Sequence, residues 1–160
     1  MSEGLAIRPE AVNIVAPLIR GSHLCAAERV TARSPRARRR AVYRLAEFCR
    51  REMGYALQYG FDGEEDDEDH VAFLWVHPEA VGMGREFRVP CVGACCFRLR
   101  EETGMALQWV WVHPYFRRRG LLTDAWPEFV REFGDFAVEG PLSDAMKGFL
   151  AKQAREGIVS

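Results

Sequence analysis

Residues 105–122 read MALQWVWVHPYFRRRGLL, and this stretch decides what kind of domain the chain forms. Its first part, 105–113, is apolar and rich in valine and tryptophan, which predicts a buried strand. The strand should stop at Pro114, because proline has no N–H to give to a strand ladder. Three arginines and Gly120 then form a turn. From Leu121 onward, apolar residues recur at steps of three and four, which predicts an amphipathic helix.

The turn between this strand and this helix is a predicted anion-binding site. The first N–H groups of a helix have no partners within the helix, and the helix dipole favours negative charge beside them. Arg117, Arg118 and Arg119 add positive charge there, and Gly120 lets a bulky anion approach the backbone closely. A pyrophosphate group fits this description.

Two further strands are predicted before this one. Residues 70–77 are apolar on both faces and stop at a proline, and residues 87–100 form a longer strand with a predicted bulge at Gly93. Turns that contain glycine join consecutive strands. We therefore expect 70–77, 87–100 and 105–113 to be antiparallel neighbours.

Three helices are predicted around the strands. An arginine-rich amphipathic helix covers 35–53, with Ser34 as its N-cap. The helix that begins near Leu121 includes Pro127, and we expect that proline to kink it. After a short strand in the sequence DFAVEGP, a last helix begins with Ser143 as its N-cap.

The order of these elements predicts one α/β (α+β) domain over residues 1–160. A chain of this length can bury a sizeable core. Helices before, between and after strands indicate a mixed, mainly antiparallel sheet flanked by helices. The first 30 residues fit a strand and a helix equally well, so their structure stays open.

Composition excludes several classes of protein. The chain is 48% hydrophobic with a formal net charge of −1, as in ordinary globular proteins. Its apolar runs are too short to span a bilayer and its start lacks a signal-peptide pattern, so we expect a cytoplasmic protein without a membrane partner. The five cysteines are an odd number without paired C-x-x-C elements, which favours reduced thiols and predicts no metal site.

Charge is segregated along the chain. Nine arginines lie between Arg29 and Arg51, and the acidic run Glu64–Asp69 follows. The arginines fall largely on the outer face of the predicted helix, so we interpret them as a solvated face. We interpret the acidic run as a mobile loop, with an acidic flank of a substrate channel as the alternative. A nucleic-acid partner is the weaker hypothesis, because the net charge is not basic.

The sequence VHPYFRRRGLL resembles the acyl-CoA-binding motif of the GNAT acetyltransferase superfamily, which is roughly V-x-P-x-aromatic-R/Q-x-x-G-x-G/A. The matching residues are Val112, Pro114, Phe116, Arg117 and Gly120. Leu122 departs from the motif, since the family has a small residue at that position. The order of predicted elements from about 70 to 153 also agrees with that family. The resemblance implies that this range is the acyl-CoA-binding core.

The resemblance implies an N-acetyltransferase that moves an acetyl group from acetyl-CoA, as co-substrate, to an amine of a small molecule or a protein. It implies that backbone groups of Val110 and Val112 pair with the pantetheine arm, and that Lys147 lies near the end of that arm. The residues that would cradle the pyrophosphate are Arg117, Arg118, Arg119, Gly120, Leu121 and Leu122.

Acetyl transfer needs a deprotonated amine, a polarised thioester carbonyl and a protonated leaving thiolate. Gln108 could orient an amine or a water, and Glu139 and Asp144 are carboxylates near the expected gap between strands. Ser143 could replace the tyrosine that the family often carries on its last helix, where this chain has Phe149. A similarity of VEGPLSDAMKGFLAK to the carboxyl end of cohesin-type acetyltransferases also favours Ser143 and Asp144, and adds a protein lysine as a candidate acceptor.

Each of these residues also has a purely structural interpretation. Ser143 is a good N-cap, Asp144 favours a helix start, and Glu139 suits the end of a strand. Acyl-CoA binding without catalysis, as a sensor or scaffold, therefore stays open, and so does a homodimer. The tetrapeptide WVHP occurs at 75–78 and 111–114, but its flanks differ, so we predict strand ends rather than a repeat or a two-histidine metal site.

Overall fold

A computed structural model describes residues 17–21, 27–54, 68–77 and 87–155 of the chain. Within these ranges, three α-helices flank an open sheet of six strands. The strands are β1 (Leu18–Gly21), β2 (Glu28–Thr31), β3 (His70–Val76), β4 (Phe87–Arg100), β5 (Gly104–Val112) and β6 (Ala137–Val138). The helices are α1 (Arg36–Met53), α2 (Leu121–Phe133) and α3 (Asp144–Arg155), with a 3-10 turn η1 (Pro114–Phe116) after β5.

The sheet is mixed and mainly antiparallel, as the sequence predicts. Its strand order is β2-β3-β4-β5-β6, and β1 pairs with the first residues of β4. Every pairing is antiparallel except that of β5 with β6, which is parallel. The three neighbouring strands expected at 70–77, 87–100 and 105–113 are confirmed.

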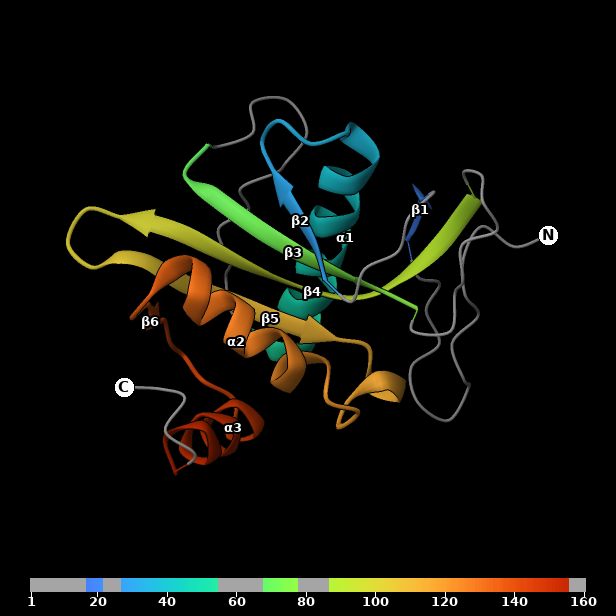
Figure 1. The fold of residues 1–160 in the computed structure, drawn as a ribbon. Helices are drawn as coiled ribbons and strands as arrows, with labels where there is room; N and C mark the ends of the chain where they lie inside the picture. The colour runs from blue at the N-terminus through green and yellow to red at the C-terminus, as the bar shows by residue number, and fades with distance from the viewer. Residues whose placement is uncertain (1–16, 22–26, 55–67, 78–86, 156–160) are drawn as a thin grey trace.

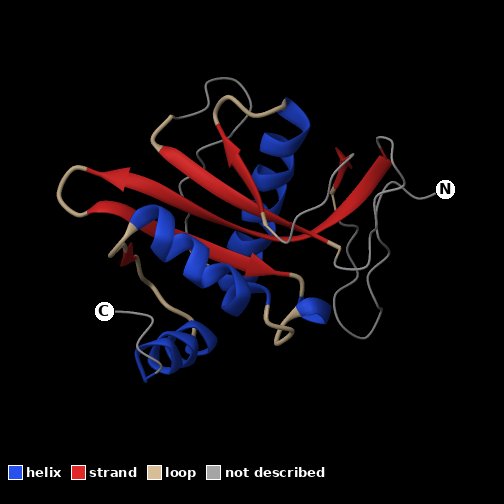
Figure 2. Ribbon diagram, viewed as in Figure 1, coloured by secondary structure: helices blue, strands red, loops and turns tan. Residues whose placement is uncertain are grey.

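Helices cover both faces of the sheet (Figure 1). The buried face of α1, with Val42, Leu45 and Cys49, packs against one side of the strands. On the other side α2 buries Trp126 and Phe129 against the strands, and Phe129 lies 4.7 Å from Phe73 between ring centroids. Burial of each such apolar side chain contributes about 1.5–3 kcal/mol, which holds the two helices on the sheet. Figure 2 shows the helices in blue around the red strands.

One predicted helix start is wrong by one residue. The N-cap of α1 is Pro35, not Ser34. The Ser34 hydroxyl instead accepts a hydrogen bond from the Thr31 N–H at 2.9 Å, and the Ser34 N–H donates to the Thr31 carbonyl at 3.0 Å. Ser34 therefore closes the turn between β2 and α1. The start of α2 is predicted correctly, because the helix begins at Leu121 and runs through the exposed Pro127.

Two bulges interrupt the ladders of β4. Trp75 of β3 pairs with Gly93 and the next residue pairs with Cys91, which leaves Val92 as the extra residue beside the predicted position. In β5, Gln108 is the extra residue, because Cys96 and Phe97 pair with its two neighbours. The second bulge was not expected from the sequence.

The described ranges hold no helix long and apolar enough to cross a membrane. They also hold no group of three histidine, cysteine, aspartate or glutamate side chains placed to bind a metal. Four cysteines there are free thiols, at positions 49, 91, 95 and 96, and burial raises the pKa of Cys91 to about 12. Cys25 and most of the acidic run Glu64–Asp69 lie outside the described residues.

Candidate active site

The edge of β5 opens after its first residues. β6 pairs with Ala106 and Leu107 only, and the Glu139 N–H then donates to the Leu107 carbonyl at 2.9 Å. β6 ends at Val138, whereas β5 continues to Val112. Figure 1 shows β6 beside the start of β5 and away from its arrowhead. Among the described residues, no strand pairs with the second half of β5 on this side, which we call the free edge of β5.

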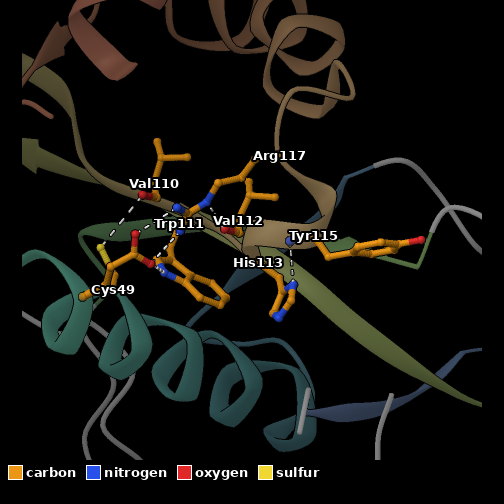
Figure 3. Close-up of polar contacts among 8 residues, drawn as sticks. Cys49, Val110, Trp111, Val112, His113, Tyr115 and Arg117 are labelled. Carbon is orange, nitrogen blue, oxygen red and sulfur yellow. Dashed lines mark hydrogen bonds and ion pairs between the residues drawn. The ribbon is translucent and has the colours of Figure 1, made fainter. Parts of the chain in front are cut away.

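The bulge at Gln108 decides which backbone groups face this edge. The His113 N–H donates to the Val92 carbonyl at 2.8 Å, so the backbone groups of every second residue before it, Trp111 and Trp109, point toward β4. The carbonyls of Val110 and Val112 point the other way, where they accept hydrogen bonds from Cys49 Sγ at 3.9 Å and Arg117 Nε at 2.6 Å (Figure 3). The N–H groups of Val110 and Val112 point the same way as their carbonyls, away from β4.

A cavity of about 710 Å³ lies along the free edge. Its wall consists of the end of α1, the edge of β5, the turn before α2, the start of α2 and one face of α3. The residues of β5 and α2 in this wall include Val110, Val112, Leu121 and Leu122. A volume of this size accommodates a cofactor-sized ligand.

A second, smaller cavity of about 30 Å³ continues from the first, and the two share Val110, Met146 and Ser143 in their walls. Gln108 and Glu139 line this smaller cavity. The geometry therefore brings together three of the four predicted catalytic residues, at the end of the large cavity that lies nearer β6.

The turn before α2 carries unusual backbone geometry. Arg118 has φ 62° and Gly120 has φ 84°, so both residues adopt left-handed conformations. For arginine this conformation is strained, and such strain concentrates at functional sites. Left-handed residues beside a helix start turn successive N–H groups toward one point, which makes a concave anion-binding site. The turn lies against the large cavity through Arg118 and Gly120.

The three arginines of the turn differ in their surroundings. Arg117 pairs with Glu52 of α1, and Arg119 donates to the Tyr115 carbonyl at 3.1 Å while its guanidinium lies 4.7 Å from the Tyr115 ring centre. Arg118 is exposed at the rim of the large cavity, whereas Arg119 is not part of its wall. An anion in this turn would therefore meet the Arg118 side chain and the backbone N–H groups.

Glu52 is a site residue that sequence reasoning missed. Its carboxylate accepts hydrogen bonds from both terminal nitrogens of Arg117, at 2.7 and 2.8 Å, and from the Trp111 indole N–H at 2.9 Å. These hydrogen bonds, chiefly those from Arg117, hold the pKa of Glu52 below its ordinary value. Glu52 and Arg117 are 65 positions apart, so no local pattern could have paired them.

Gln108 and Ser143 are the two uncharged residues among the predicted catalytic residues, and both line the smaller cavity. Gln108 Oε1 is buried and has no hydrogen-bond partner among the described residues. Ser143 is confirmed as the N-cap of α3, since its hydroxyl accepts from the Met146 N–H at 3.1 Å. Because Ser143 lines both cavities, its hydroxyl hydrogen stays available to a ligand while its oxygen caps the helix.

The charged candidates are placed differently. Glu139 accepts two hydrogen bonds from Arg100, at 2.7 and 2.9 Å, and this pairing lowers the pKa of Glu139. A lowered pKa makes Glu139 a weaker base. Asp144 is exposed at the start of α3 and lies outside both cavity walls. Lys147 is also outside them, whereas Lys152, five residues later on α3, lines the large cavity.

The two WVHP sequences meet at one residue. The rings of His77 and His113 lie 5.2 and 6.1 Å from the Phe116 ring, between centroids. His113 also caps η1, because its Nδ1 accepts from the Tyr115 N–H at 3.0 Å. Both histidines therefore pack under the turn before α2, and the tryptophan of each copy is buried in the core.

Comparison with known sequences finds no protein-family model that matches the chain, and no curated protein that matches it. The resemblance to GNAT enzymes therefore stays a prediction from the sequence, made from residues 112–122 and the order of the elements around them.

Proposed function

We propose that the chain is an acetyl-CoA-dependent N-acetyltransferase with its active site along the free edge of β5. The observation that carries the proposal is the cavity between this edge and α3, which has the left-handed residues Arg118 and Gly120 at one end and Gln108 and Ser143 at the other. An acyl-CoA has the same order of parts: a pyrophosphate, an extended amide-containing arm and a thioester.

The ligand would lie along β5 with its pyrophosphate at the turn. The N–H groups from Arg118 to Leu122 and the start of α2 would bind the phosphates. The carbonyls of the pantetheine arm would accept hydrogen bonds from the N–H groups of Val110 and Val112, which point to the free edge, while the carbonyls of these valines keep their contacts with Cys49 and Arg117. The thioester would then lie toward Gln108, at the smaller cavity, whose volume of about 30 Å³ is enough for an ordered water.

In the reaction, the nitrogen of the acceptor amine attacks the thioester carbonyl carbon. The carbon–sulfur bond breaks, its electron pair leaves on the CoA sulfur, and an amide bond forms. A backbone N–H at the Gln108 end of the free edge would polarise this carbonyl. The proton lost by the amine passes to water, and Ser143 would relay a proton from this water to the leaving thiolate, so its hydroxyl is restored. Gln108 Oε1 would accept a hydrogen bond from the amine.

The removal of the amine proton is assigned to water rather than to a buried base. Glu139 is held as an anion by Arg100 and is a weak base. Asp144, next to Ser143, is exposed to solvent and would accept the proton from water there. If part of the amine is already deprotonated when it binds, a water near Glu139 is a sufficient base.

A second function, acyl-CoA binding without transfer, is favoured by one observation. Phe149 lines the large cavity where GNAT enzymes often have a tyrosine, and it packs 5.0 Å from the Trp126 ring. This side chain can bind an apolar arm but cannot donate a proton.

Two measurements separate these functions. Acetyl-CoA at about 100 times its Kd should raise the melting temperature by roughly 5 °C or more under either one. Release of free CoA, screened across amines and lysine peptides with mass detection of the acetylated product, should occur only with a transferase. If millimolar acetyl-CoA leaves the melting temperature unchanged, both functions are excluded. A nucleic acid that shifts it instead, with strong salt dependence, would support the arginine-rich face as the functional surface.

A further inference from the structure

The end of α1 is tied to the turn before α2 through one carboxylate. Glu52 accepts from Arg117 Nη1 and Nη2 at 2.8 and 2.7 Å, and from Trp111 Nε1 at 2.9 Å. Arg117 also donates from Nε to the Val112 carbonyl at 2.6 Å, and its guanidinium lies 5.8 Å from the Trp111 ring centre. Arg117 is thus held at three places by α1 and β5 (Figure 3).

This contact fixes the backbone on one side of a strained residue. Arg118, with φ 62°, follows Arg117 directly, and Arg119 on its other side is held by the Tyr115 carbonyl. A left-handed arginine persists only where the surrounding contacts hold it in place. Glu52 supplies the charged part of that restraint, and a bidentate arginine–carboxylate pair also fixes direction.

Glu52 is poorly suited to act on a substrate itself. Its carboxylate lines the large cavity, but the hydrogen bonds from Arg117 lower its pKa and keep it ionised. A bare carboxylate near the pyrophosphate would repel it, whereas a carboxylate paired with arginine does so far less. The role that fits its geometry acts through Arg117.

We infer that Glu52 is a positioning residue: by holding Arg117 against β5 it fixes the turn at Arg118–Gly120 in its anion-binding form. The inference rests on the proposed function. It makes the affinity for the pyrophosphate part of an acyl-CoA depend on Glu52, and it leaves the binding of the pantetheine arm independent of Glu52.

The test compares CoA with pantetheine, which lacks the pyrophosphate, by calorimetry on the full chain. Glu52→Ala should weaken CoA about tenfold or more, as expected for the loss of charge-assisted hydrogen bonds, and change pantetheine less than about threefold. Glu52→Gln, which keeps the shape and loses the charge, should give an intermediate CoA affinity. Glu132→Ala is the matched control, because it breaks an ion pair of similar exposure with Arg29 outside the large cavity.

A double-mutant cycle with Arg117→Gln tests the route of the effect. GNAT motifs accept glutamine at this position, and a glutamine does not need the carboxylate. If Glu52 acts through Arg117, Glu52→Ala should have no further effect on CoA affinity in the Arg117→Gln background. Equal losses for CoA and pantetheine, or additive losses in the cycle, would overturn the inference.

The outcomes also distinguish this inference from the proposed function. A wild-type chain that binds neither CoA nor pantetheine contradicts both. A wild-type chain that binds CoA, together with a folded Glu52→Ala variant of unchanged CoA affinity, contradicts only the role of Glu52. Far-UV circular dichroism and the melting temperature establish that each variant is folded.

Discussion

Gly93 of β4 lies so close to β5 that a Cβ added to it would stand 2.8 Å from the carbonyl oxygen of Trp111. The same atom would lie 3.1 Å from the Cα of Val112. These two residues belong to the half of β5 whose other edge forms the cavity. β4 therefore supports the site by direct contact between backbones, with no side chain between them.

Gly93→Ala should destabilise the protein by about 1–3 kcal/mol, because the backbone of β5 has to move to admit the methyl group. Gly148→Ala in α3 is the control, since its Cβ would meet no atom within 4 Å. That change should stabilise the chain by roughly 0.5–1 kcal/mol through helix propensity. Urea unfolding measures both free energies, and equal values for the two variants would contradict the close contact.

Gly120→Asp should abolish measurable CoA binding. The left-handed backbone at φ 84° disfavours any side chain, and a carboxylate there would face the pyrophosphate. Gly104→Asp places the same residue at φ 74° in the turn between β4 and β5, away from the large cavity. It should cost similar stability and leave CoA affinity unchanged. Calorimetry that finds the two variants equal in CoA binding would show that the turn does not hold the ligand.

Ser143 can be tested for its two roles separately. Ser143→Ala removes the cap hydrogen bond to the Met146 N–H and should cost about 1 kcal/mol of stability. Ser143→Asn should recover most of that stability, because asparagine is as good an N-cap. Both variants lack the hydroxyl, so both should release CoA about tenfold or more slowly. Wild-type turnover in the asparagine variant would restrict Ser143 to capping.

Acid should destabilise the protein through Glu52 and Glu139. Pairing with Arg117 and Arg100 lowers the pKa of these carboxyls below the ordinary value of 4.5. In acid the unfolded chain then binds more protons than the folded chain, so this stabilisation is complete above about pH 4.5 and is lost as the pH falls through the lower folded values. Glu139→Gln should flatten the stability profile in this range. Unfolding titrations at several pH values measure it, and an unchanged acid slope would contradict the pairing.

The fold and the main chain of the site could be predicted because their signals are local. Residues 105–122 specify a strand, a turn and a helix through periodicity, a proline and a glycine, and the structure has these elements at Gly104–Val112 and Leu121–Phe133. Ser143 was predicted as a cap for the same reason. Ser34 was predicted wrongly, because its hydroxyl has two competing uses nearby and the turn takes it.

The side-chain partners could not be predicted because they depend on contacts between distant elements. Glu52 meets Arg117 only when α1 packs on the sheet, and Glu139 meets Arg100 only after β6 pairs with β5. Lys147, predicted as a cofactor-binding residue, lies outside the wall of the large cavity, since the direction in which α3 faces is set by packing of the whole helix. The bulge at Gln108 also lacks a local signal such as glycine.

The free edge of β5 also affects the tendency of the protein to aggregate. An unpaired strand edge is a template for aggregation, because its N–H and C=O groups can add a strand from another molecule. Here the carbonyls of Val112 and Val110 accept hydrogen bonds from Arg117 and Cys49. Pro141, soon after β6, has no N–H with which to extend the pairing of β6 with β5. These contacts therefore leave fewer carbonyls at the free edge for a strand of another polypeptide to pair with.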